Sequence, residues 1–191
     1  MYVDIHCHPH FKTFLGSELE HERKNCWTNL DFDIGLGILD SQSSLSQLVK
    51  GQVKLAVVPL YALENAFAKA NLIQLTAGLS DHAKKRFLQK IEREEFGYYE
   101  LMQADLIHLI NSADVSADKS FKLLNAGSQV DLSSMQLQVM LAVEGGHNFY
   151  DNGQHYTNTQ RVIDRLLSFK TPSSPRLIYI TLTHLTHSAF C

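Results

Sequence analysis

Short apolar runs alternate with amphipathic runs along this chain. Four runs are too continuously apolar and β-branched for half-exposed strands, and they predict buried strands. These runs are residues 2–5, 54–61, 138–143 and 177–182. Apolar residues at helical spacing fill much of the sequence between them, in residues 44–49, 64–75, 82–110 and 159–169. Strands that alternate with helices predict parallel strands, right-handed crossovers and an α/β fold.

The remaining segments are less regular. Gly97 interrupts the longest helical pattern and predicts either two helices or one broken helix. Residues 9–40 are polar and poorly periodic, which predicts a long loop over a site. Residues 121–124 fit either a short extra strand or a helical turn. The TPSSP sequence of residues 171–175 predicts a turn between a helix and a strand.

Composition narrows the class of protein. The 191 residues are 45% hydrophobic, with 17 basic and 20 acidic side chains, so we expect one domain over residues 1–191. The absence of a basic excess argues against nucleic acid or an anionic membrane as the partner. No apolar run is long enough to span a bilayer and no leader pattern is present, so we expect a cytoplasmic protein. Three unpatterned cysteines agree with a reducing compartment.

Three of the predicted strands end in side chains that can bind a metal ion or polarise a substrate. His6 and His8 follow the first strand, Glu144 ends the third, and His184 ends the fourth. Because the carboxyl ends of parallel strands meet at one edge of a sheet, these groups are expected to converge there.

The His6-Cys7-His8 sequence has the alternation of a strand. Residues two apart point to the same side, so both imidazoles can reach one ion at roughly 2.0 to 2.1 Å. Cys7 is then expected to face the packing layer as a small hydrophobe. The alternative is a pair of exposed histidines at the entrance of a loop.

Glu144 lies in LAVEGGH, where an apolar strand ends in an acid and two glycines. Such a carboxylate is costly to bury without a cation, and it can bridge two divalent ions. A helix cap or a salt bridge is the alternative.

The other histidines are assigned from their positions alone. His184 is expected either to polarise a substrate carbonyl or to be a hydrogen-bonded rim residue. His147 either orients the acid or the substrate, or lies on the surface, and His187 is a candidate to support the site. The remaining histidines are expected to be structural or solvated: His10, His21, His82, His108 and His155.

The sequences DIHCH, LAVEGGHNF and RLIYITLTHLTHSAF together resemble the membrane dipeptidase family (renal dipeptidase, peptidase M19) of the metal-dependent amidohydrolase superfamily. The resemblance implies a (β/α)8 TIM barrel, of which this chain would hold about four parallel strands as an incomplete barrel. It also implies two zinc ions and a metal-bound hydroxide that attacks the peptide bond of a dipeptide or a related small amide.

The resemblance implies a role for each matching residue. His6 and His8 would be metal ligands, Glu144 a bridging ligand and catalytic residue, and His184 a catalytic residue that binds the substrate carbonyl. The family usually has aspartate where this chain has His8, so the metals would keep more positive charge here. The family's later ligands have no counterpart, so we expect the N-terminal portion of a longer hydrolase or a shortened gene.

Three functions therefore remain open at this level. The first is a metallohydrolase that acts on a dipeptide or small amide once its remaining ligands are supplied. The second is a catalytically incomplete half-barrel, an oligomerising or regulatory module that forms homo-oligomers through its open sheet edge. The third is a phosphoesterase of the polymerase and histidinol phosphatase type, which also opens with His-x-His. The chain has no Gly-rich nucleotide loop and no Gly-x-Ser-x-Gly elbow, so nucleotide-binding and serine-hydrolase functions are set aside.

Overall fold

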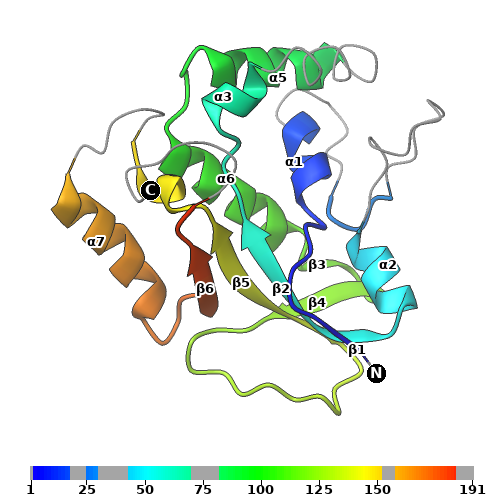
Figure 1. Ribbon diagram of the computed structural model, residues 1–191. Helices are drawn as coiled ribbons and strands as arrows, with labels where there is room; N and C mark the ends of the chain where they lie inside the picture. The colour runs from blue at the N-terminus through cyan, green and yellow to red at the C-terminus, as the bar shows by residue number, and fades with distance from the viewer. Residues whose placement is uncertain (1, 18–24, 30–42, 70–81, 152–157, 184–191) are drawn as a thin grey trace.

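The protein is a mixed α/β structure built on one sheet (Figure 1). The computed structural model describes residues 2–17, 25–29, 43–69, 82–151 and 158–183. The strands are β1 Tyr2–Asp4, β2 Val53–Leu60, β3 Asp114–Ser116, β4 Lys119–Leu123, β5 Leu137–Glu144 and β6 Leu177–Thr181. The helices are α1 Phe11–Ser17, α2 Leu45–Lys50, α3 Asn65–Ala68, α5 His82–Glu92, α6 Tyr98–Asn111 and α7 Thr159–Leu167, with 3₁₀ turns η1 Gly146–Phe149 and η2 Ser168–Lys170.

The sheet is mostly parallel, and its four main strands follow the order of the chain. β1 pairs with β2, β2 with β5, and β5 with β6, all in parallel. β4 pairs in parallel with the first half of β5, on the side where β6 pairs with the second half. β3 joins β4 as an antiparallel hairpin. The predicted α/β fold with parallel strands is confirmed.

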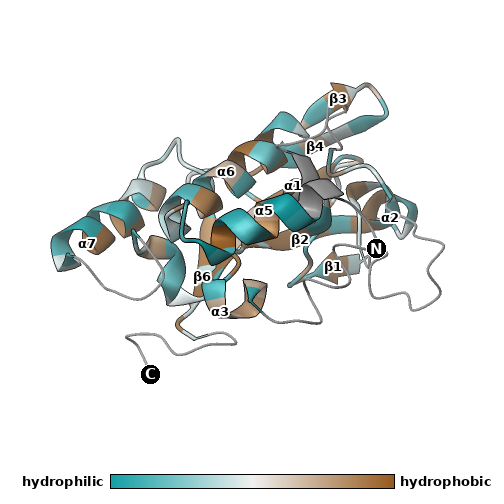
Figure 2. Cartoon of the chain, turned by 90° about the horizontal axis from the view of Figure 1, so that it is seen from above, coloured by the Kyte–Doolittle hydropathy of each residue, from teal (hydrophilic) through white to brown (hydrophobic). Residues whose placement is uncertain are grey.

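The helices of the described part pack against one face of the sheet. The larger apolar cluster joins alternate residues of the strands, such as Val58 and Val143, to helical residues such as Leu48, Leu101 and Val162. The opposite face has a smaller cluster of strand and loop residues, namely Leu55, Val57, Leu124, Met140 and Ala142, with Tyr179 packed against it. Seen from above, α6 and α7 lie along the same side of the strands (Figure 2). The alternation of each strand thus assigns one set of side chains to the helices and the other to the opposite face.

The structure differs from one sequence prediction and decides two open choices. Residues 9–40 were expected to form a loop, but α1 begins at Phe11, because Phe14 is 4% exposed and packs edge-on against Phe87. The open choice at residues 121–124 resolves to strand β4, which pairs with β5. The break at Gly97 produces two helices, α5 and α6. A β-carbon at Gly97 would overlap the carbonyl oxygen of Asp151, so this close approach requires glycine.

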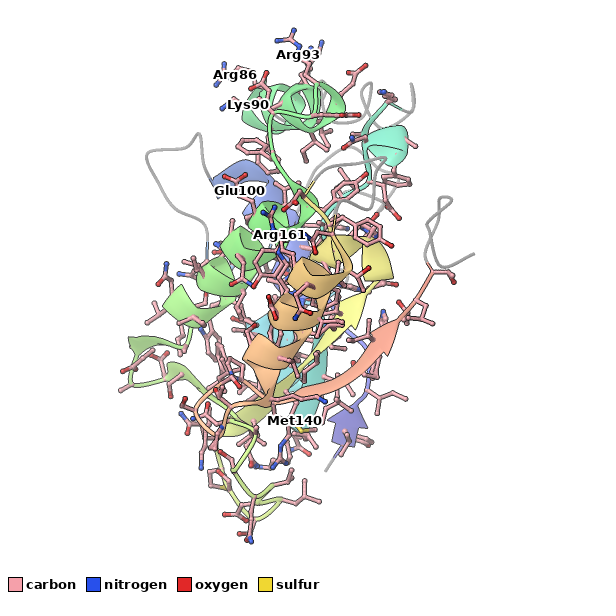
Figure 3. The ribbon with its side chains drawn as sticks, turned by 90° about the vertical axis from the view of Figure 1, so that its left-hand side faces the viewer. Arg86, Lys90, Arg93, Glu100, Met140 and Arg161 are labelled. Atoms are coloured by element: carbon pink, nitrogen blue, oxygen red, sulfur yellow. The ribbon has the colours of Figure 1, made fainter. Side chains whose placement is uncertain are left out.

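Both ends of the parallel array present exposed apolar side chains. Tyr2 and Ile5 at the β1 edge are 65% and 72% exposed, and Ile178 on β6 is 47% exposed. Arg86 on α5 and Arg93 in the turn after it project into solvent at one end of the molecule (Figure 3). Within the described ranges, none of the helices combines the length and the apolar character that crossing a bilayer requires.

Candidate metal centre

The chain beyond β1 stays extended beside β2, and this places the two histidines. The Cys7 N–H donates to the Val57 carbonyl oxygen at 3.2 Å, which continues the parallel ladder past the end of β1. Cys7 therefore faces the helix layer, where it is 6% exposed, and His6 and His8 lie on the opposite side. Burial raises the pKa of the Cys7 thiol to about 12, so this residue is a protonated core side chain, as predicted.

Glu144 ends β5 at a sharp turn. Gly145 has a φ of 94°, a conformation that side chains disfavour, and its N–H donates to the hydroxyl of Thr181 at 2.8 Å. The turn brings the chain into η1, where the Asn148 amide donates to the Glu144 carbonyl oxygen at 2.7 Å. Asn148 also accepts from the Ala62 N–H at 2.6 Å, just after β2. The sheet and this one amide thus fix where the Glu144 backbone lies.

The structure brings three predicted ligands together. Nε2 of His8 lies 3.0 Å from Oε2 of Glu144, and Nε2 of His6 lies 3.7 Å from Oε1. The two Nε2 atoms are 3.2 Å apart. Two ligand atoms that each lie roughly 2.0 to 2.1 Å from a tetrahedral zinc ion are about 3.3 Å apart. The separations of 3.0 and 3.2 Å are close to this value, and one ligand atom from each of the three side chains lies within 4.8 Å of the other two, so the two imidazoles and the carboxylate could hold a single divalent ion.

The site opens to solvent through a pocket of about 530 Å³. The side chains of His6, His8 and Glu144 are 42%, 28% and 17% exposed. Phe11, Tyr61, Lys12 and Asp4 also line the pocket, so two aromatic rings, one cation and one further carboxylate lie near the three donors. A ligand of dipeptide size can therefore enter and reach the three donors.

A tyrosine from β6 contacts the first histidine. The Tyr179 hydroxyl lies 2.8 Å from Nδ1 of His6, and the two rings stack with centroids 6.4 Å apart. Burial and the charge of Glu144 raise the pKa of Tyr179, so it stays a phenol at neutral pH. Nothing in the sequence pattern distinguished Tyr179, although it lies within the RLIYITLTHLTHSAF sequence, two residues before the end of β6.

A buried polar pair anchors the turn that follows His8. His10 and Asp105 are both fully buried, and Nδ1 of His10 lies 3.3 Å from Oδ1 of Asp105 on α6. Nε2 of His10 lies 3.1 Å from the Pro59 carbonyl oxygen at the end of β2. Burial lowers the pKa of His10 and raises the pKa of Asp105, so burial favours the uncharged form of each side chain. His10 is structural, one of the two roles proposed from the sequence.

His108 and His147 are structural side chains too. Nε2 of His108 lies 2.9 Å from the Thr13 hydroxyl, and burial lowers the pKa of His108 to about 4. Nε2 of His147 lies 2.8 Å from the Ala62 carbonyl oxygen, and His147 is 6% exposed. The surface location considered for His147 is therefore wrong, because η1 turns this ring inward against the segment after β2.

The remaining predicted site residues lie outside the described part of the chain. His184 and His187 belong to residues 184–191, and their expected roles stay predictions. His21 and His155 also lie outside the described residues.

Comparisons with known proteins indicate neither a family nor a function for this chain. No protein-family model matches the chain, and neither a curated protein nor a solved structure matches it. The resemblance to membrane dipeptidases therefore has no support from these comparisons, and the geometry of the site must carry the functional argument.

Proposed function

We propose that this protein is a metal-dependent hydrolase in which His6, His8 and Glu144 hold a divalent ion. The observation that carries the proposal is the convergence of two imidazoles and one carboxylate at an open pocket, with one ligand atom from each within 4.8 Å of the others. Structural zinc sites take four protein ligands, whereas catalytic sites keep a position open for water or substrate. Three donors and an open pocket match the catalytic arrangement.

The three side chains have distinct tasks in this proposal. A bound divalent ion would lower the pKa of a coordinated water and polarise a carbonyl oxygen. His6 and His8 supply neutral ligands, so they leave the positive charge on the site. Glu144 presents one oxygen towards each histidine, and one of them can bind the ion while the other accepts a proton from the attacking water.

We take zinc as the expected ion and a dipeptide or related small amide as the expected substrate. Imidazole and carboxylate ligands suit zinc. The two aromatic rings of the pocket, Phe11 and Tyr61, can pack against an apolar side chain, and Lys12 can attract a terminal carboxylate. The second zinc ion expected for a complete site would need donors in addition to these three.

The architecture supports a barrel of the (β/α)8 type. The four main strands succeed one another in chain order, and the helices pack on one face, whereas a doubly wound sheet would reverse direction and carry helices on both faces. The metal donors lie on the other face, at the carboxyl ends of the strands, where TIM barrels assemble their active sites.

The test combines metal binding with a substrate panel. We expect the purified chain to bind one zinc ion by competition against a chromophoric chelator. We also expect it to hydrolyse a dipeptide or an N-acyl amino acid in a reaction that EDTA stops and zinc restores. Phosphomonoesters in the same panel test the phosphoesterase alternative. Stoichiometric zinc binding without amide hydrolysis would contradict the hydrolase, and no zinc binding would contradict the whole proposal.

A second candidate, a module that forms homo-oligomers, is favoured by the exposed edges of the sheet. An edge strand with exposed apolar side chains can pair with another chain. Tyr2 and Ile5 at the β1 edge and Ile178 on β6 provide such surfaces at both ends of the parallel array. A second copy of this chain, running parallel, is the occupant we propose.

Light scattering at micromolar concentration checks this second candidate. We expect a dimer in the wild-type protein and a shift to monomer in Ile178→Lys, because a buried lysine would oppose the pairing. Ile110→Lys on α6 is the matched control, since Ile110 is 43% exposed and lies away from both edges. A wild-type protein that is monomeric at that concentration contradicts the module.

A further inference from the structure

The two candidate histidine ligands differ in how their outer ring nitrogens are held. Nδ1 of His6 lies 2.8 Å from the Tyr179 hydroxyl. Nδ1 of His8 is buried and has no hydrogen-bond partner among the described residues. Among the described residues, the Tyr179 hydroxyl therefore constrains the ring of His6 at Nδ1, whereas no hydrogen bond constrains the ring of His8 there.

The direction of the hydrogen bonds follows from the second contact of the tyrosine. The Tyr179 hydroxyl donates its single proton to the Ile5 carbonyl oxygen at 3.2 Å. With that proton assigned to Ile5, the Tyr179 oxygen accepts from His6, and this assignment places the proton of the neutral imidazole on Nδ1. Nε2 of His6 is left with its lone pair, and this is the atom that faces Glu144 and His8.

Tyr179 contacts two consecutive residues of the chain. Ile5 and His6 are consecutive, so Tyr179 holds both the backbone before the ligand and the ring of the ligand itself. The stacked arrangement of the rings, with an interplanar angle of 14°, fixes the tilt of the imidazole as well. Through Tyr179, β6 therefore positions His6, although His6 follows β1 at the opposite edge of the four main strands.

We propose that Tyr179 is a positioning residue that holds His6 in the Nδ1–H tautomer and presents Nε2 to the metal ion. The proposal rests on the metal site of the proposed function. Hydrogen bonds to the outer nitrogen of a ligand histidine orient the ring, and their loss costs 10- to 100-fold in metal affinity or activity. Because the acceptor here is a neutral hydroxyl, it orients the ring without adding a negative charge behind it.

Tyr179→Phe is the direct test, with Tyr99→Phe as its matched control. Tyr99 lies on α6, where its ring stacks with the Arg165 guanidinium, so this control also removes one phenol hydroxyl. We expect zinc affinity to fall by about 10- to 100-fold in Tyr179→Phe and to stay within twofold in Tyr99→Phe. The visible absorption spectrum of the Co²⁺-loaded protein should change only in Tyr179→Phe. Unchanged metal affinity and an unchanged Co²⁺ spectrum in Tyr179→Phe would overturn the proposal.

A second measurement does not depend on metal binding or on the folding of a variant. Long-range ¹⁵N–¹H correlation spectra of the metal-free wild-type protein at mildly alkaline pH report the tautomer of His6. We expect the Nδ1–H form, and an Nε2–H form would overturn the inference. If the wild-type protein binds no ion, the proposed function is contradicted. The tautomer of His6 tests the role of Tyr179 whether or not the protein binds an ion.

Discussion

Replacing Glu144 by glutamine is expected to weaken zinc binding by at least 100-fold. The amide keeps the size of the side chain, but it removes the negative charge and turns one of the two oxygens that face the histidines into an N–H donor. Loss of a direct ligand should exceed the 10- to 100-fold cost of losing a group that only supports a ligand. Competition with a chromophoric chelator at constant pH measures the effect.

Glu95→Gln is the matched control for this substitution. Glu95 is exposed between α5 and α6, and its Oε1 lies 3.9 Å from Nη1 of the exposed Arg93, so its loss should leave zinc affinity unchanged. If Glu144 were only a hydrogen-bond acceptor for His8, Glu144→Gln would change zinc affinity by less than tenfold. A change of less than tenfold would contradict Glu144 as a metal ligand and would indicate only a polar contact between Glu144 and His8.

The second large effect is expected from Asp105→Ala, which should lower the free energy of unfolding by about 1 to 3 kcal/mol, the cost of leaving a buried polar group unsatisfied. The substitution leaves the fully buried His10 ring without its partner on α6 and opens space beside it. Because His10 anchors the turn after His8, the change should also loosen one metal ligand. Urea unfolding followed by circular dichroism measures the stability, and chelator competition measures the ligand.

Two further variants test whether the loss of stability comes from the contact between His10 and Asp105 or from the removal of any acidic side chain. Asp114→Ala removes an exposed aspartate on β3 and should change stability by less than about 0.5 kcal/mol. The double variant His10→Leu/Asp105→Leu replaces both partners by apolar groups and should recover part of the loss. A cost below about 1 kcal/mol for Asp105→Ala would show that the pair does not contribute to the fold as argued.

The candidate site depends on three strands that meet at one edge of the sheet. β1 and its extension supply His6 and His8, β5 supplies Glu144, and β6 supplies Tyr179. The tight turn at Gly145 and the Asn148 amide hold the carboxyl ends of β2 and β5 together. Activity and metal affinity should therefore respond to changes in these backbone supports as well as to changes in the ligands.

Much of the fold could be predicted because each strand is short and apolar. The four predicted strands agree with β1, β2, β5 and β6 to within one or two residues at each end. Helix α1 was missed because it is only seven residues long and its stability comes from Phe14 packing on Phe87, a contact between residues distant in sequence. Propensity and periodicity carry no information about such a contact.

The sequence by itself determined which residues lie on the same side of a strand and which strands end in side chains that can bind a metal ion. The period of two places His6 and His8 together and sends Cys7 to the core, whatever the strands pair with. Only the tertiary structure decided that Glu144 lies beside both histidines, that Tyr179 contacts His6 and that Asp105 lies beside His10. Those contacts join residues about 95 to 175 positions apart. They depend on strand order, crossover direction and register, which local patterns do not specify.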